Sequence, residues 1–259
     1  MLYLILRYLL RYRLKVVKKN VAYSFPEKTE KERNKIVNDF YRHFTRQNLE
    51  SLQFIFISKK AIQRKFIFDN IDILDQYAQQ GRNITAVIGH YGNWDWIASI
   101  PLWSDKFIVG TLYKRIKNKF LNNLFLKIRS RFGVYCIDMK HAIRGLVKLN
   151  NGPKPNIVAY IADQCPWNEN TKYWINFLNQ PTATQSGWAT IARKFDTPVV
   201  YLNITPIKKG HYLAHIEIVT EDPSSMSERE LVEAYFSKLE RDIKQQPEYW
   251  LWSHRRWKR

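Results

Sequence analysis

The chain has 259 residues, of which 45% are hydrophobic and 25% are charged, so it can bury a sizeable core and is not a disordered chain. Forty-two Lys and Arg against 23 Asp and Glu give a formal charge of +19, which favours anionic partners: a membrane surface, phosphorylated substrates, an acidic carrier protein or nucleic acid. The two cysteines, Cys136 and Cys165, are too few for a disulfide framework or a zinc cluster.

The N-terminal segment, MLYLILRYLLRYRLKVVKK, begins with a short apolar run that Arg7 interrupts. A membrane-spanning helix needs about 20 apolar residues, and no small-residue cleavage site of a signal peptide follows. Read as one helix, the segment has leucines on one face and basic residues beside them, which predicts a helix lying in the headgroup region of an anionic leaflet. A helix packed on the domain, or an anchor upstream of this chain, stays open. The leucines are Leu2, Leu6, Leu9, Leu10 and Leu14, and the basic residues are Arg7, Arg11, Lys15 and Lys18.

A long amphipathic helix is predicted after Pro26. Thr29 and Glu32 have the spacing of a capping box, in which the threonine accepts from a free amide and the glutamate reaches back. Ile36, Phe40 and Phe44 continue the apolar face at helical spacing, and the pattern runs to residue 57.

From residue 84 onward, short apolar runs alternate with helical stretches. This order predicts an α/β sandwich with a mixed, largely parallel sheet flanked by helices. Lys209 and Gly210 predict a hairpin between the last two strands. We expect residues 26–259 to form a single α/β domain that follows a membrane-interface helix over residues 1–25. The predicted strands are 84–89, 107–113, 134–137, 156–162, 198–205 and 212–219, and the predicted helices are 94–103, 118–131, 141–149, 183–195 and 227–245.

The segment AVIGHYGNWDW, residues 86–96, has the residue types of a catalytic site. A buried strand brings His90 to its carboxyl end, where ligands bind in open α/β sheets, and Gly92 allows a tight turn. Such a turn can bring Asp95 within hydrogen-bond reach of His90, so that the carboxylate holds the imidazole and the other ring nitrogen acts as a general base. A histidine that caps a helix or is satisfied at the sheet edge would show the same pattern.

The nucleophile of such a site is expected to come from the substrate. Ser186 lies in TQSGW, which is not the G-x-S-x-G turn of a serine nucleophile. The remaining histidines show no ligand spacing with cysteines or carboxylates, so we expect neither a metal nor another cofactor. These histidines are His141, His211, His215 and His254.

HYGNWD resembles the H-x4-D/E motif of glycerolipid acyltransferases, and nearly the whole chain is similar to the lipid A late acyltransferases, the bacterial lauroyl and myristoyl transferases of lipopolysaccharide biosynthesis. Further segments resemble that family in the same order along the chain: VVKKNVAYSFPEKTEKER, YKRIKN, RSRFGVYCID followed by Arg144, IADQ, TQSGWATIARKFDTPVVYL and PEYWLWSHRRWK.

The resemblance implies transfer of a fatty acyl chain to the hydroxyl of a 3-hydroxyacyl group on a lipid A precursor. The acyl donor is usually acyl carrier protein, and coenzyme A stays open as an alternative. It places the enzyme at the cytoplasmic face of the bacterial inner membrane, held peripherally or by a single anchor. By position, His90 would deprotonate the hydroxyl and Asp95 would orient His90.

The same resemblance suggests which residues bind the substrate or the reaction's oxyanion. Arg115 is the first candidate, but the family reads Tyr-basic-Pro where this chain has Tyr-Lys-Arg, so Lys114 is an alternative. Asp163 is expected to hold Arg115 or Arg144, or to cap a turn. Asn93, at the predicted helix start, completes the set.

Other functions are compatible with parts of this pattern. The acceptor could be another membrane lipid, such as a glycerophospholipid or a glycolipid, and a catalytically inactive membrane-binding relative would keep the same fold. The basic, aromatic tail would also suit nucleic acid, although no recognition motif accompanies it and we expect no nucleic-acid partner. The anionic partners favoured instead are an acidic carrier protein, the acceptor's phosphates and the membrane surface.

Overall fold

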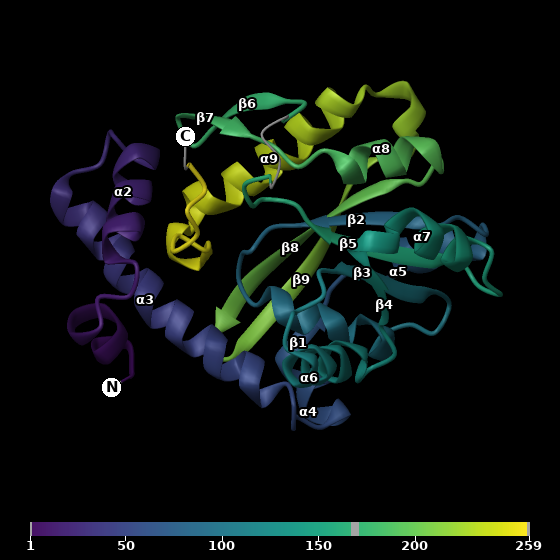
Figure 1. The fold of residues 1–259 in the computed structure, drawn as a ribbon, viewed down its shortest axis with the longest axis horizontal. Helices are drawn as coiled ribbons and strands as arrows, with labels where there is room; N and C mark the ends of the chain where they lie inside the picture. Colours follow the sequence, from purple (N-terminus) through teal and green to yellow (C-terminus); the bar gives the residue numbers. More distant parts are fainter. Residues whose placement is uncertain (1, 167–170, 258–259) are drawn as a thin grey trace.

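In the computed structural model, which describes residues 2–166 and 171–257, a seven-stranded sheet has the order β1-β9-β8-β2-β5-β3-β4 (Figure 1). Its neighbouring strands run parallel except for β8 and β9, which form an antiparallel hairpin. A separate antiparallel hairpin consists of β6 and β7. The strands are β1 (Phe66–Phe68), β2 (Ile84–Ile88), β3 (Ile108–Tyr113), β4 (Tyr135–Asp138), β5 (Asn156–Ile161), β6 (Trp174–Phe177), β7 (Gln180–Ala183), β8 (Val199–Lys208) and β9 (His211–Thr220).

Helices cover both faces of the sheet, with α8, α9 and the β6–β7 hairpin above it and α4 and α6 below it in the view of Figure 1. The α-helices are α1 (Leu2–Leu4), α2 (Leu14–Ser24), α3 (Glu30–Gln53), α4 (Lys59–Lys65), α5 (Asp72–Gln79), α6 (Lys119–Ser130), α7 (Ala142–Asn150), α8 (Gly187–Lys194) and α9 (Glu228–Gln245). The π-helix η1 (Ile5–Leu9) follows α1, and the 3-10 helices are η2 (Trp94–Leu102), η3 (Met139–His141), η4 (Pro223–Ser225) and η5 (Pro247–Tyr249).

The prediction of an α/β fold with a largely parallel sheet is confirmed. Each strand and helix predicted from residue 84 onward is present, with small differences at the ends; the helix predicted from 183 begins at Gly187 because residues 180–183 form β7. The predicted hairpin is also confirmed, since Gly210 makes the turn between β8 and β9 with a φ of +70°. Strands β1, β6 and β7 and helices α4 and α5 were not predicted.

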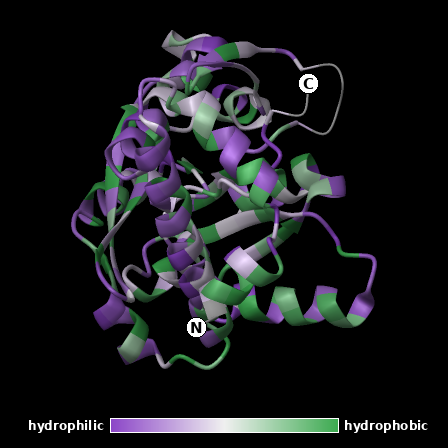
Figure 2. Cartoon of the chain, turned by 90° about the vertical axis from the view of Figure 1, so that its left-hand side faces the viewer, coloured by the Kyte–Doolittle hydropathy of each residue, from purple (hydrophilic) through white to green (hydrophobic). Residues whose placement is uncertain are grey.

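The central strands β2 and β5 are mostly apolar, as expected for strands whose two faces are both covered. Successive side chains of a strand point to opposite faces. In β2, Ala86 and Ile88 pack into the apolar cluster between the sheet and α4, α5 and η2. Val87 points the other way and packs into the cluster between the sheet and α8 and α9. Figure 2 shows hydrophobic segments interspersed with hydrophilic ones along the outer helices, as expected for elements with one buried face.

Helix α3 starts where the sequence predicted. The Thr29 hydroxyl accepts from the Glu32 amide, and the Glu32 carboxylate accepts from the Thr29 amide at 2.7 Å, which is the expected capping box. The helix ends at Gln53 rather than at residue 57.

The continuous helix expected over the first residues is interrupted. Arg11 and Arg13 have backbone φ angles of +47° and +51°, which a right-handed helix cannot contain, so α2 begins only at Leu14. The expected basic stripe is interrupted as well, because Arg7 is buried and its Nε donates to the Asn38 side chain at 3.2 Å.

The predicted leucine face is divided between the core and the surface. Leu6 and Leu14 pack against the core, whereas Leu9 and Leu10 are 75% and 64% exposed; the side chain of Leu2 lies outside those that the structure describes. Across residues 2–166 and 171–257, the helices are all too short or too polar to cross a bilayer. The role of residues 1–25 as an interface segment stays a prediction.

Candidate active site

His90 and Asp163 lie side by side because they follow two neighbouring strands. Strands β2 and β5 pair in parallel, with Ile88 opposite Ile161. Since each polar residue stands two positions beyond its isoleucine, the parallel register carries both to the same edge of the sheet. That edge is the carboxyl edge, at which α/β folds bind their ligands.

The Asp163 carboxylate holds His90 at two points. Its Oδ1 lies 2.5 Å from Nδ1 of the imidazole, and its Oδ2 accepts from the His90 amide at 2.9 Å. The Asp163 side chain is buried, whereas that of His90 is 15% exposed. The pair therefore consists of a buried carboxylate and an imidazole that reaches the surface.

The pKa of Asp163 is about 2 although the carboxyl is buried. Burial by itself raises this pKa, but the charge and hydrogen bonds of His90 and the indole of Trp250 lower it by more. Asp163 is therefore a carboxylate at neutral pH and accepts a hydrogen bond from the N–H at Nδ1 of His90. This fixes the imidazole tautomer, with the hydrogen on Nδ1 and the lone pair on Nε2.

The second imidazole nitrogen contacts Gln164, the residue after Asp163. The Gln164 side-chain amide donates to Nε2 of His90 at 3.1 Å. The backbone carbonyl of Gln164 in turn accepts from the Gln185 side chain at 3.2 Å. A nitrogen that accepts a hydrogen bond here can accept a proton from a hydroxyl that replaces the amide.

The turn after His90 requires glycine at position 92. Gly92 has a φ of +63°, and a Cβ there would lie 2.3 Å from the backbone oxygen of Ile204. A larger residue would therefore both strain the backbone and displace β8. The predicted role of Gly92 is confirmed.

One face of α3 packs against the turn that follows His90 and hydrogen-bonds to it. His43, Gln47, Glu50 and Ser51 are spaced to lie on one side of the helix. His43 Nε2 donates to the Gly92 carbonyl at 3.1 Å. Burial raises the pKa of Glu50, while hydrogen bonds from Tyr212 and Asn93 oppose that rise.

Asp95 is held by α3 rather than by His90. Its Oδ2 accepts from the Ser51 hydroxyl at 2.5 Å and from the Gln47 amide at 3.1 Å. We expected Asp95 to accept a hydrogen bond from the imidazole, whereas Nδ1 of His90 donates to Asp163. The reason is that η2 starts directly at Trp94 and turns Asp95 toward α3, while strand pairing delivers Asp163.

Asn93 is also differently placed from the expectation that it binds substrate. It is fully buried, and its side-chain amide donates to Glu50 Oε2 at 3.0 Å. In this position it secures the turn to α3.

The C-terminal tail packs across the same turn, which the sequence did not predict. Trp250 Nε1 donates to Asp163 Oδ2 at 2.8 Å, and the amide of Leu251 donates to the carbonyl of His90 at 3.1 Å. The amide of Gly92 donates to the carbonyl of Tyr249 at 3.1 Å. Trp250 is thus a supporting residue of the site; the clustering of tryptophans in PEYWLWSHRRWKR was its one signal.

The predicted basic residues follow neighbouring strands at the carboxyl edge. Lys114 and Arg115 come directly after β3, and Arg144 lies in the first turn of α7, after β4. All three are exposed. Arg115 Nε lies 3.6 Å from Asp138 Oδ2, so the carboxylate that Arg115 approaches is Asp138 and not Asp163 as expected.

His254 and His215 serve in local contacts. His254 Nε2 accepts from the Cys165 amide at 3.2 Å, and His215 pairs with Asp69 at 2.8 Å. Arg256 is buried and donates to the Ala183 carbonyl at 2.5 Å, which makes it a packing residue. Within the described part of the chain, no three His, Cys, Asp or Glu side chains are grouped so that they could hold a metal ion.

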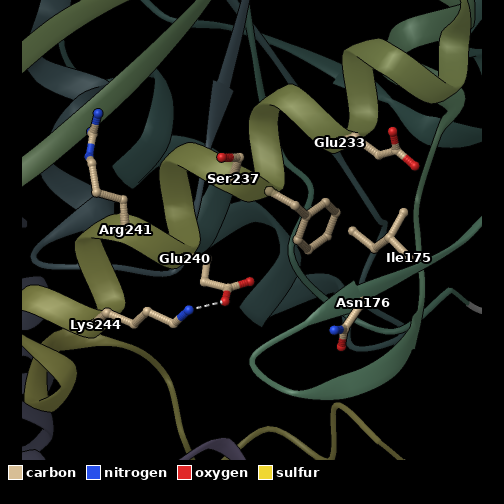
Figure 3. A pocket seen from close by; sticks show the side chains of 8 residues that line it. Ile175, Asn176, Glu233, Ser237, Glu240, Arg241 and Lys244 are labelled. Carbon is tan, nitrogen blue, oxygen red and sulfur yellow. Dashed lines mark ion pairs between the residues drawn. The ribbon is translucent and has the colours of Figure 1, made fainter.

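A cavity of about 460 Å³ lies between α9 and β6, and none of its lining residues belongs to the His90 site. Figure 3 shows acidic and basic side chains around it, with Lys244 paired to Glu240. Its mixed charges and its separate lining make it a surface groove beside the helix rather than the reacting centre. The lining residues are Ile175, Asn176, Glu233, Phe236, Ser237, Glu240, Arg241 and Lys244.

Comparison with known proteins assigns the class. Residues 4–259 match a family of acyltransferases, so this protein is an enzyme of that class. The family is described as bacterial lipid A biosynthesis acyltransferase, and the chain belongs to it. The resemblance seen in the sequence motifs is therefore confirmed.

Similar curated proteins carry matching descriptions. The chain is 22% identical over 251 residues to a lipid A biosynthesis palmitoleoyltransferase of Escherichia coli (strain K12), covering 96% of this chain and 80% of the relative. The same figures hold for a lipid A biosynthesis acyltransferase of Shigella flexneri. A lipid A biosynthesis acyltransferase of Haemophilus influenzae is 23% identical over 177 residues, covering 67% of this chain and 54% of the relative.

The His43 contact predicts a pH dependence of stability. Burial lowers the pKa of His43 to about 4 from its ordinary 6.5, so between these values the unfolded chain binds more protons. The contribution of neutral, buried His43 to the free energy of unfolding is fully present above pH 6.5. It is lost as the pH falls toward 4, by up to about 3 kcal/mol. Urea unfolding followed by tryptophan fluorescence at a series of pH values measures it.

His43→Gln is the matched control, because its amide can still donate to the Gly92 carbonyl but does not titrate. As the pH falls from 7 to 4, the free energy of unfolding of the parent should decrease by up to about 3 kcal/mol more than that of the variant. Parallel curves over that range would show that His43 is not the titrating group.

Proposed function

We propose that this enzyme transfers a fatty acyl group from an acyl carrier protein thioester to a hydroxyl of a lipid A precursor, with His90 as the general base. The observation that carries the proposal is the hydrogen bond between His90 Nδ1 and the buried carboxylate of Asp163. Family membership supports lipid A as the acceptor class, and the names of the curated relatives support a fatty acyl group as the cargo.

The proposed reaction uses this hydrogen-bonded pair. Nε2 of His90 takes the proton from the acceptor hydroxyl while the hydroxyl oxygen attacks the thioester carbonyl carbon. Asp163 stabilises the imidazolium that forms, as the carboxylate does in a catalytic triad. The tetrahedral oxyanion then collapses, the carbon–sulfur bond breaks, and the imidazolium returns the proton to the leaving thiolate.

The acceptor hydroxyl has to replace Gln164. Nε2 has a single lone pair in the ring plane, and the Gln164 amide occupies it at 3.1 Å. In our proposal the side chain swings aside as the hydroxyl arrives and covers Nε2 again when the product leaves.

Asp95 and Asn93 act through the position of the turn in this proposal. Nδ1 carries one hydrogen, which it already donates in its hydrogen bond to Asp163. Asp95 therefore acts on His90 indirectly, because its hydrogen bonds with Ser51 and Gln47 fasten the turn to α3. Asn93 supports the turn in the same way through Glu50.

In our proposal, basic side chains bind the negatively charged groups of the substrates and of the transition state. Lys114, Arg115 and Arg144 are exposed at the carboxyl edge and are our candidates for stabilising the oxyanion or binding the acceptor's phosphates. The formal charge of +19 attracts both an acidic carrier protein and an anionic leaflet over a distance that salt shortens. We therefore place the enzyme at the cytoplasmic face of the bacterial inner membrane.

Substitution of the two carboxylates separates their roles. His90→Ala and Asp163→Asn should each lower kcat by a factor of about 10² to 10⁴, because one removes the base and the other its orienting charge. Asp95→Asn should lower it by roughly tenfold or less, since its contacts with α3 are only weakened. Mass spectrometry of a lipid A precursor incubated with acyl carrier protein thioesters measures the transfer.

Circular dichroism melting is the control for folding, because Asp163 is buried. If Asp95→Asn matched His90→Ala while a folded Asp163→Asn enzyme stayed active, Asp95 would be the partner of His90. Full activity of His90→Ala would end the proposal of a histidine base.

Removal of the Gln164 amide tests the displacement step. Gln164→Ala should lower the KM for the acceptor a few-fold at unchanged kcat, because binding no longer breaks a hydrogen bond worth about 1 kcal/mol. Gln185→Ala is the control, since it perturbs the same loop without touching His90. A fall in kcat of more than about tenfold in Gln164→Ala alone would instead assign Gln164 a role in the chemical step.

The exposed N-terminal leucines test the interface segment. Leu9→Ser with Leu10→Ser should weaken sedimentation with phosphatidylglycerol vesicles while turnover of a detergent-dispersed acceptor persists, because both side chains are exposed and neither supports the site. Unchanged vesicle binding would exclude these leucines from the membrane contact. Point changes are preferable to a truncation, because Tyr12 and Arg13 make contacts with the rest of the chain.

A further inference from the structure

Helix α6 exposes apolar side chains where a globular protein normally buries them. Of its residues, all of which the structure describes, Asn122 alone is buried. Phe120 is 74% exposed and Phe125 is 43% exposed, and Leu121 lies exposed between them. Ile116, just before the helix, is exposed as well.

These side chains form one face of the helix. Phe120, Leu121 and Phe125 share it with Leu124 and Ile128, since positions i, i+1, i+4, i+5 and i+8 fall on one side when each residue turns about 100°. Lys127 borders this face on one side and Arg129 on the other. A helix with an apolar face and basic borders has the pattern of one that lies in a membrane interface.

The segment around α6 is strongly basic. Between Tyr113 and Asp138 the sequence has seven basic residues and no acidic one: Lys114, Arg115, Lys117, Lys119, Lys127, Arg129 and Arg131. Lys119 stands in the first turn of α6, where no acidic residue offsets it. The helix macrodipole disfavours a cation at this end, so the local helix gains nothing from this lysine.

The C-terminal half of α6 attaches it to the body of the protein. Ile128 packs against the core cluster below the sheet, and Arg131, directly after the helix, donates to the Phe54 carbonyl at 2.5 Å. At the other end, the Ile116 amide donates to the Asn122 side chain at 3.0 Å, which ties the preceding segment to the helix. Lys117, Lys119 and Phe120 therefore stand at the end of the helix that is farther from this attachment, and Phe125 lies near its middle.

Helix α6 follows β3, whose carboxyl end lies two strands from that of β2. Strand β3 runs parallel to β5, and β5 runs parallel to β2, so the segment after Tyr113 leaves the sheet at the edge where His90 lies. The two strand ends are separated by two strand spacings, roughly 10 Å. A surface bound by this segment would meet the carboxyl edge of the sheet.

From these observations we infer that Ile116, Lys117, Lys119, Phe120, Leu121 and Phe125, which we term the α6 surface, dock the enzyme on an anionic lipid bilayer. Phenyl and leucyl side chains enter the boundary of the acyl chains, while the lysines meet lipid phosphates. An acidic protein would pair with the lysines but would have to supply a matching apolar groove for Phe120. The role of this contact in presenting the acceptor to His90 rests on the proposed function, whereas the contact itself is measurable without turnover.

The apolar part of the α6 surface is tested by Phe120→Ser with Phe125→Ser. Sedimentation with vesicles of phosphatidylglycerol and phosphatidylcholine should weaken by roughly tenfold or more, because both phenyl rings leave the acyl boundary. Trp174→Ser is the matched control, because it removes an exposed aromatic side chain from the β6–β7 hairpin, above the opposite face of the sheet. Its binding should equal that of the parent chain.

The charged part is tested by Lys117→Glu with Lys119→Glu. Binding to anionic vesicles should fall by roughly tenfold or more, and the remaining binding should no longer depend on phosphatidylglycerol content. Glu in the first turn favours the macrodipole, so loss of the helix cannot explain the result. Arg193→Glu with Lys194→Glu, on exposed positions of α8, is the control for net charge and should bind more tightly than the α6 variant.

Turnover of a detergent-dispersed acceptor separates this inference from the proposed function. Loss of vesicle binding with retained detergent turnover is the expected result. Unchanged vesicle binding in both α6 variants would overturn the inference, and if turnover with an acyl carrier protein donor fell instead, the α6 surface would be a protein-docking site. Failure of the parent chain to transfer acyl groups would overturn the proposed function and leave the vesicle result standing.

Discussion

The arrangement of the site depends on the pairing of β2 with β5. That pairing places a fully buried carboxylate against the ring nitrogen of a histidine that reaches the surface. A buried carboxylate is stable only when hydrogen bonds satisfy it, and the amide of His90, its Nδ1 and the indole of Trp250 do so. The contacts that lower the pKa of Asp163 are thus the contacts that orient the imidazole.

The turn after His90 is enclosed between two parts of the chain that are distant in sequence. On one side, His43 and Glu50 of α3 hydrogen-bond to residues of the turn. On the other side, Tyr249 and Trp250 of the C-terminal tail hydrogen-bond to Gly92 and Asp163. Such supporting contacts hold the His90 side chain in one geometry. The cost is a set of buried polar groups, His43 and Glu50 among them, whose pKa values are displaced by burial.

The opposite situation holds at α6, where apolar side chains are left uncovered. A soluble enzyme acting on a small polar substrate has no use for exposed phenylalanines among lysines. An enzyme whose acceptor is a phosphorylated lipid has to bring its sheet edge to a bilayer, and the α6 surface has the chemistry for that contact. The exposed leucines of the N-terminal segment are a second candidate for the same contact.

The sequence by itself determined the class of fold, because apolar runs and helical periodicity depend on neighbouring residues, and the capping box at Thr29 and the turn at Gly92 are local as well. It also placed His90 at the carboxyl end of a buried strand and, through motifs in a fixed order, indicated the acyltransferase family. It did not pair His90 correctly: the near carboxylate, Asp95, was the natural choice along the chain. Only the tertiary structure decided for Asp163, because strand order and register place residues 90 and 163 side by side, and neither is encoded in the local pattern of either strand.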